Sequence, residues 1–74
     1  MTTTVIEYTY IISRVLSGSD ADGSGWEEKG TSIQEVVDRN RWTLTVLCSQ
    51  ELAMAECEDD NGENICYAIV RKRE

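Results

Sequence analysis

The amino-acid sequence predicts an α+β fold, in which one α-helix packs on one face of an antiparallel sheet of four or five strands. Runs rich in β-branched and aromatic residues, at 5–16 and 42–49, are typical of strands. Helix-capping residues open the stretch 31–40. An Asn61-Gly62 pair between two apolar segments is the strongest short-range signal for a β-hairpin.

Length and charge limit what the chain can do. Its 74 residues suffice for a single domain, 1–74, with a thin hydrophobic core and no deep cleft. Fourteen acidic against seven basic residues give a net charge of −7, which disfavours direct binding to nucleic acid or to an anionic membrane. The expected partners are therefore basic.

The sequence also predicts a cytoplasmic location. It has no apolar run of about 18 residues, and the first four residues lack the basic start and apolar stretch of a signal peptide. Three cysteines, Cys48, Cys57 and Cys66, cannot all pair within one chain and form no C-x-x-C motif. They are expected to be small buried side chains.

Residues 5–16 (VIEYTYIISRVL) predict the first strand, whose side chains alternate between two faces. The face with Tyr10 and Ile12 is expected to be the more buried. About 17–30 is predicted as a flexible acidic loop, because Gly, Ser and Asp dominate its first half. A short edge strand is expected at 26–29.

The next two elements follow from capping and from alternation. Thr31 and Ser32 each precede a Gln or Glu by three residues, so a helix of about ten residues is expected to start there and to end near Asn40. Its buried stripe would hold Ile33, Val36 and Val37. Alternation in 42–49 then predicts a second central strand, with one face formed by Trp42, Leu44, Val46 and Cys48.

The Asn61-Gly62 turn predicts the register of the last hairpin. A two-residue loop would place Cys57 opposite Cys66, at a distance that permits a disulfide, although a cytosolic setting favours two thiols. One side of the hairpin would be small and would receive the helix: Ala53, Ala55, Cys57, Cys66, Ala68 and Val70. The other side, with Leu52, Met54, Ile65, Tyr67 and Ile69, would be left uncovered as a possible second interface, for example in a homodimer.

Catalysis and metal binding are not expected. The chain has no histidine to activate a cysteine and no Gly-rich phosphate loop, so it is predicted not to be an enzyme. Asp20-x-Asp22 resembles the opening of a calcium loop, but Glu27 and Thr31 stand at the eighth and twelfth positions, where an apolar residue and a bidentate Glu belong. No metal or other cofactor is therefore expected.

The acidic residues are the remaining candidates for function. They would either keep a small protein soluble or form a partner-binding surface against a basic groove that normally holds nucleic acid, since Arg and Lys also bind carboxylates. The predicted partner-binding residues lie at the hairpin tip and in the first loop: Glu56, Glu58, Asp59, Asp60, Glu63, Asp20, Asp22, Glu27 and Glu28.

The order of elements resembles that of small phage-encoded anti-CRISPR proteins that inhibit a type I surveillance complex. The resemblance rests on Tyr10-Ile11-Ile12-Ser13-Arg14-Val15, a loop, a short capped helix, a strand with Thr45-Val46 and a hairpin at Asp60-Asn61-Gly62. It implies a non-enzymatic inhibitor in the host cytoplasm that binds the guide-RNA-holding subunits. The acidic tip departs from the basic inhibitor of that family, so its basic contacts are not carried over. The alternative function is a small homodimeric structural or assembly protein.

Overall fold

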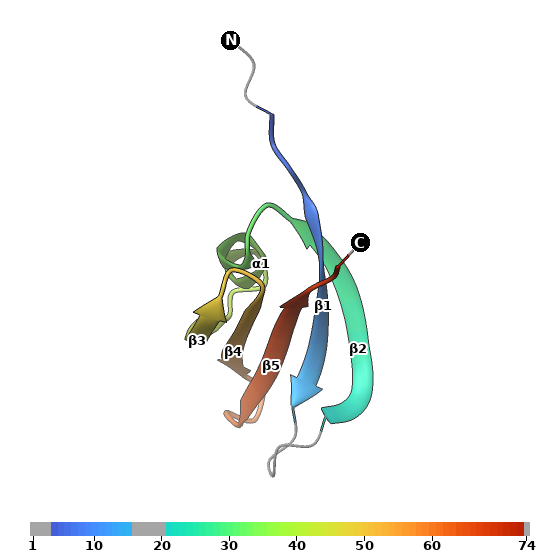
Figure 1. Cartoon of the computed structure of the whole chain (residues 1–74). Coiled ribbons are helices and arrows are strands. Elements are labelled where there is room, and N and C mark those ends of the chain that lie inside the picture. Colours follow the sequence, from blue (N-terminus) through green and yellow to red (C-terminus); the bar gives the residue numbers. More distant parts are fainter. Residues whose placement is uncertain (1–3, 16–20, 74) are drawn as a thin grey trace.

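The computed structural model describes residues 4–15 and 21–73, and for residues 21–24 it describes the backbone alone. The described chain forms a five-stranded antiparallel sheet with one helix on one face, which confirms the predicted fold class (Figure 1). The strands are β1 (Tyr8–Val15), β2 (Ala21–Gly30), β3 (Thr43–Ser49), β4 (Leu52–Glu58) and β5 (Asn64–Arg71), and the helix is α1 (Ile33–Arg39). Their order in the sheet is β2-β1-β5-β4-β3, so β5 is central.

Helix α1 packs on the sheet face that carries Tyr10, Ile12, Ala53, Ala55 and Ile69, which we call the helix face. Its stripe of Ile33, Val36 and Val37 is buried as predicted. Tyr10 and Ile12 of β1 meet this stripe, together with residues of β4 and β5, and the core is completed by Ala53, Ala55 and Ile69. Two alanines in β4 leave room for the helix to approach the sheet closely.

The helix is shorter than predicted, with seven residues, but both of its ends follow the sequence signals. The Ser32 hydroxyl accepts a hydrogen bond from the Glu35 amide at 3.2 Å, and Asn40 is the C-cap. Beyond it, the Trp42 amide donates to the Val37 carbonyl at 3.0 Å and the Arg41 amide to Asp38 at 3.1 Å. This pair of bonds is a Schellman motif, and Arg41 adopts the positive φ of 60° that the motif requires.

Strand β2 corrects the prediction of a flexible loop at 17–30. Residues 21–30 form a ten-residue edge strand that pairs with β1, and only the short strand at 26–29 was expected. Pairing with β1 supplies the backbone with partners, so the unfavourable strand propensity of Gly and Asp is overridden. Residues 17–20 of the predicted loop lie outside the described part.

Strand β3 is an edge strand, so the prediction of a second central strand is wrong. Register irregularities follow Leu44 and Leu47, so that Val46 pairs with Met54 and Leu47 with Ala53. The irregularity moves Val46 to the opposite face from Leu44, and it breaks the predicted single face of 42–48. Bulges of this kind also protect an edge from pairing with another strand.

The register of the β4–β5 hairpin is shifted by one residue from the prediction. Cys57 pairs with Ile65 and Cys66 with Glu56, so the two cysteines do not face each other. Because neighbouring residues of a strand point to opposite faces, Cys57 lies on the helix face and Cys66 on the other face. All three cysteines are free thiols, and Cys48 is exposed, contrary to the expectation that it is buried.

The same shift redistributes the two predicted sides of the hairpin. Ile65, Tyr67 and Ile69 lie on the helix face rather than on the uncovered side, while Cys66, Ala68 and Val70 lie away from the helix. Leu52 and Met54 stay on the uncovered side as predicted. We call that side the open face, and its apolar side chains include Ile11, Val15, Val46, Leu52, Met54, Ala68 and Val70.

Candidate partner-binding surface

The acidic hairpin tip is held by a three-residue turn. The Asp59 amide donates to the Glu63 carbonyl at 2.9 Å, and the Gly62 amide donates to the Asp59 carbonyl at 3.0 Å. Gly62 has a φ of 78°, which places a left-handed residue at the end of the loop. This is the hairpin in which a type I turn is followed by a glycine bulge, and its extra loop residue causes the register shift.

Asp59 is a structural member of the tip. One of its carboxylate oxygens, Oδ1, accepts hydrogen bonds from the Asn61 amide at 2.8 Å and from the Glu63 amide at 2.9 Å. An Asp side chain that bonds the backbone two residues on stabilises a turn. Its role is therefore to shape the tip, in addition to any role in partner binding that the sequence predicts.

The tip carboxylates Glu58, Asp60 and Glu63 are exposed, and Glu56 is half-buried on the open face. No ion pair or side-chain hydrogen bond joins them to another residue in the described ranges. The sequence from 42 to 70 contains six acidic residues and neither Lys nor Arg. The β4–β5 tip thus carries negative charge that no cation of the described residues compensates.

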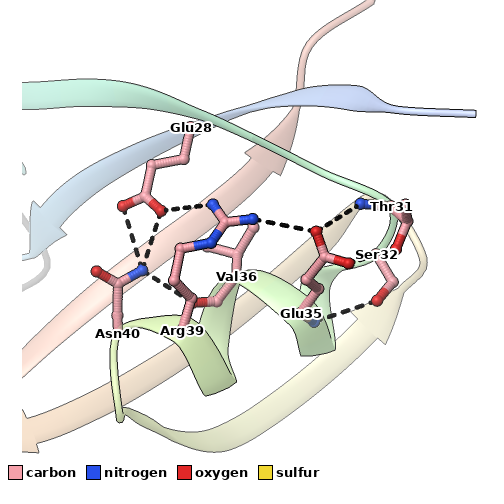
Figure 2. A network of polar contacts seen from close by, with 7 residues as sticks. All are labelled: Glu28, Thr31, Ser32, Glu35, Val36, Arg39 and Asn40. Atoms are coloured by element: carbon pink, nitrogen blue, oxygen red, sulfur yellow. Dashed lines mark hydrogen bonds and ion pairs between the residues drawn. The ribbon is translucent and has the colours of Figure 1, made fainter.

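The other predicted binding residues do not join the tip. Glu28 accepts hydrogen bonds from Arg39 at 3.2 Å and from the Asn40 amide group at 3.1 Å, so it ties β2 to the end of α1 (Figure 2). Glu27 pairs with Lys72 at 3.5 Å on the open face. Asp20 lies outside the described residues, and the side chain of Asp22 in β2 is not among the described ones.

Glu35 belongs to the same structural network as Glu28. Its carboxylate accepts hydrogen bonds from the Thr31 hydroxyl at 2.8 Å and the Thr31 amide at 3.2 Å, and it pairs with Arg39 at 3.0 Å (Figure 2). The Thr31 hydroxyl, the Thr31 amide and the Arg39 charge lower the pKa of this carboxyl below its ordinary value. Glu35 therefore caps the helix and is not available to a partner.

Positive charge gathers at the opposite end of the sheet, where β1 begins and β5 ends (Figure 1). Arg71 pairs with Glu51 at 3.3 Å, and its guanidinium carbon lies 4.1 Å from the centre of the Tyr8 ring. Lys72 and Arg73 follow it and are exposed. The described chain is thus acidic at the β4–β5 tip and basic at the other end.

Sequence reasoning missed an aromatic cluster on the helix face. The Trp42 and Tyr67 rings stack at 4.4 Å, and Trp26 meets Tyr67 edge-on at 5.5 Å. The indole nitrogen of Trp26 donates to Glu28 at 2.7 Å. The Schellman motif places Trp42 and the shifted register places Tyr67, so neither position followed from the predicted hairpin.

A groove of about 370 Å³ lies between the start of α1 and the basic end of the sheet. Its walls include Tyr8, Tyr10, Leu44 and Leu47, with Arg71 at one side. Among the described residues, the lining contains no carboxylate, Cys or His that could act as a general base.

Two further properties concern the described residues alone. They contain no group of three or more Cys, Asp or Glu side chains placed to hold a metal ion. Their one helix is too short to cross a membrane.

Comparison of the chain with protein-family models, with curated proteins and with solved structures found no match to any of them.

Proposed function

We propose that the chain is a non-enzymatic binding module that uses the β4–β5 tip to occupy a basic nucleic-acid-binding site on a larger protein complex. The observation that carries the proposal is the contrast between two sets of carboxylates. Glu27, Glu28 and Glu51 are paired with cations within the molecule, whereas Glu58, Asp60 and Glu63 are exposed and unpaired among the described residues.

Unpaired carboxylates on a rigid turn suit this role. The two hydrogen bonds of Asp59 fix the backbone on which Asp60 and Glu63 stand, so little entropy is lost when a partner binds them. Arg and Lys that bind phosphates also bind carboxylates, and a concentrated negative charge accelerates association with a basic surface. The resemblance to anti-CRISPR proteins of phages names one class of partner, a type I surveillance complex in the host cytoplasm.

Capture experiments with matched charge variants test the proposal. The tip variant Asp60→Lys/Glu63→Lys reverses two tip charges and spares Asp59. The control variant Glu7→Lys/Asp38→Lys changes the net charge by the same amount at exposed sites away from the tip. Each immobilised protein is exposed to nuclease-treated bacterial lysate, and the captured proteins are eluted with increasing salt and identified.

The wild-type protein and the control variant are expected to retain the same nucleic-acid-binding complex, which elutes as the salt rises. The tip variant is expected to lose it. Four units of charge at about 0.5 kcal/mol each amount to about 2 kcal/mol, or an affinity loss of about 30-fold. Equal retention by all three proteins would show that the tip charge serves only solubility.

A further inference from the structure

The open face of the sheet is an exposed apolar surface. Ile11, Val70 and Leu52 are neighbours across β1, β5 and β4, and each is 36–42% exposed. The next row toward the tip places Ala68 beside Met54, which pairs with the 46% exposed Val46. Large side chains thus form a continuous band over four strands, as is typical of an interaction surface.

Nothing in the described part of the chain covers this band. The helix lies on the opposite face, where its stripe of Ile33, Val36 and Val37 is buried in the core. Antiparallel sheets can leave one face in water, but that face is then usually polar. Here the middle rows of the face are mostly apolar, although Glu27 lies beside Ile11 and pairs with Lys72, and the other described charges stand toward the two ends.

The charges on the open face are arranged with opposite signs at opposite ends. Lys29 pairs with Thr9, whose carbonyl accepts the Lys72 amide at 2.7 Å, so both lysines lie in one row at the basic end. Glu56 and Glu58 lie at the tip end, opposite Cys66 and Asn64 of β5. Lys72 and Asn64 are each four residues from Ala68, so the two charged rows are equally far from the middle of β5.

We propose that the open faces of two copies of this chain pack together about a two-fold axis that crosses the strands at Ala68. This axis reverses the strand direction between copies, so the row of Lys29 and Lys72 in one copy lies over the row of Glu58 and Asn64 in the other. The apolar bands meet between these rows. The surface is therefore complementary to itself, as a two-fold interface requires.

The size of the face fits a small dimer. Five strands about 4.8 Å apart and eight residues at about 3.3 Å each give roughly 600 Å² per copy, or about 1,200 Å² in total. This area lies at the lower end of the range for specific interfaces. Two sheets packed face to face also keep their strands nearly aligned, which the proposed axis permits.

Two leucine variants test the location of the interface. Leu52 on the open face and Leu47 on the helix face are 42% and 59% exposed, so Leu47→Lys is a matched control for Leu52→Lys. The mass measured by light scattering and sedimentation at increasing concentration is expected to reach twice 8.4 kDa for the wild type and for Leu47→Lys. Leu52→Lys should raise the dissociation constant at least about tenfold.

Should Leu52→Lys fail to fold, which circular dichroism shows, Val70→Thr removes apolar surface at nearly the same volume and is expected to weaken the dimer. Lys72→Glu and Glu58→Lys are each expected to weaken it, and the double variant to restore it, because both signs are exchanged. A wild-type chain that stays monomeric at millimolar concentration overturns the proposal. A dimer lost with Leu47→Lys but kept with Leu52→Lys also overturns it.

This proposal stands apart from the proposed function. The tip variant Asp60→Lys/Glu63→Lys leaves Leu52, Val70, Lys72 and Glu58 in place and is expected to remain dimeric. Loss of partner capture with an intact dimer, or loss of the dimer with intact capture, therefore separates the two proposals.

Discussion

Two residues with positive φ shape the connections on either side of β3 and β4. Gly62 ends the hairpin loop with a φ of 78°, and Arg41, which follows the helix C-cap Asn40, has a φ of 60°. The left-handed region is open to Gly and is unfavourable for most other residues. Gly62 therefore adopts its backbone conformation without strain, whereas Arg41 adopts one that is unfavourable for its residue type.

Replacement of Gly62 by Ala is expected to destabilise the protein by about 1 kcal/mol. A Cβ at this position would contact nothing within 4 Å, so the cost comes from the backbone conformation alone. Chemical denaturation measures the free energy of unfolding. Gly62→Asn serves as the control and should cost less, because Asn tolerates this conformation better than Ala. Equal losses for the two variants would contradict the assigned turn.

Replacement of Arg41 by Gly is expected to stabilise the protein by about 0.5–1 kcal/mol, since Gly adopts the C-terminal position of a Schellman motif without strain. Arg41 forms no ion pair within the described residues whose loss would offset the gain. The thermal midpoint of unfolding measures the effect. A lower midpoint for Arg41→Gly would argue against the left-handed helix end.

A single side-chain hydrogen bond explains why the hairpin register could not be predicted from the sequence. The Asn61-Gly62 pair correctly indicates a hairpin, but a two-residue turn of the expected type needs a positive φ at both residues. Only Gly62 has it, because the Asp59 carboxylate accepts the Asn61 amide and stabilises a three-residue loop instead. The choice between these loops depends on one side-chain hydrogen bond that the dipeptide does not reveal.

At the level of elements, the helix was predictable because its signals are local. Capping residues and the spacing of Ile33, Val36 and Val37 are read within one stretch of sequence. Strand β2 was predicted only at 26–29, since the Gly, Ser and Asp residues before Trp26 have weak strand propensity and owe their form to pairing with β1. The acidic residues of the candidate site were identifiable by composition, but the pairing of Glu27 and Glu28 with cations depends on tertiary structure.

The network around α1 predicts a pH-dependent contribution to stability. The pKa of Glu35 is lowered in the folded protein, mainly by hydrogen bonds from Thr31. Its contribution is present above the unfolded value of about 4.5 and is lost as the pH falls through the lower folded pKa. The Glu35→Gln variant should therefore unfold more easily than the wild type at pH 7. This difference in thermal midpoint should shrink below pH 4.5, and a difference that is constant with pH would contradict the assignment.

The shifted hairpin predicts the chemistry of its two cysteines. Cys57 and Cys66 lie on opposite faces of the sheet, so a disulfide between them would require the hairpin to change register. Peptide mapping under non-reducing conditions, after mild oxidation of the folded protein, is expected to find no peptide that links these two residues. Recovery of a Cys57–Cys66 cross-link would favour the two-residue loop over the observed one.

At the scale of the whole molecule, charge and apolar surface are separated. The β4–β5 tip is acidic, the opposite end is basic, and the open face between them is apolar. A dimer formed through the open face would carry its two tips at opposite ends, where each remains accessible to a partner. The two proposals share Glu58 and otherwise use different residues, since Asp60 and Glu63 belong to the turn beyond the paired strands.

The central claim is that the tip carboxylates compete with nucleic acid for a basic site. The most direct test is the binding of labelled target DNA to a purified type I surveillance complex in the presence of the wild-type protein, the tip variant or the control variant. We predict that the wild type and the control variant displace the DNA equally, and that Asp60→Lys/Glu63→Lys needs about 30-fold more protein. Equal displacement by all three proteins, or none by the wild type, would contradict the account.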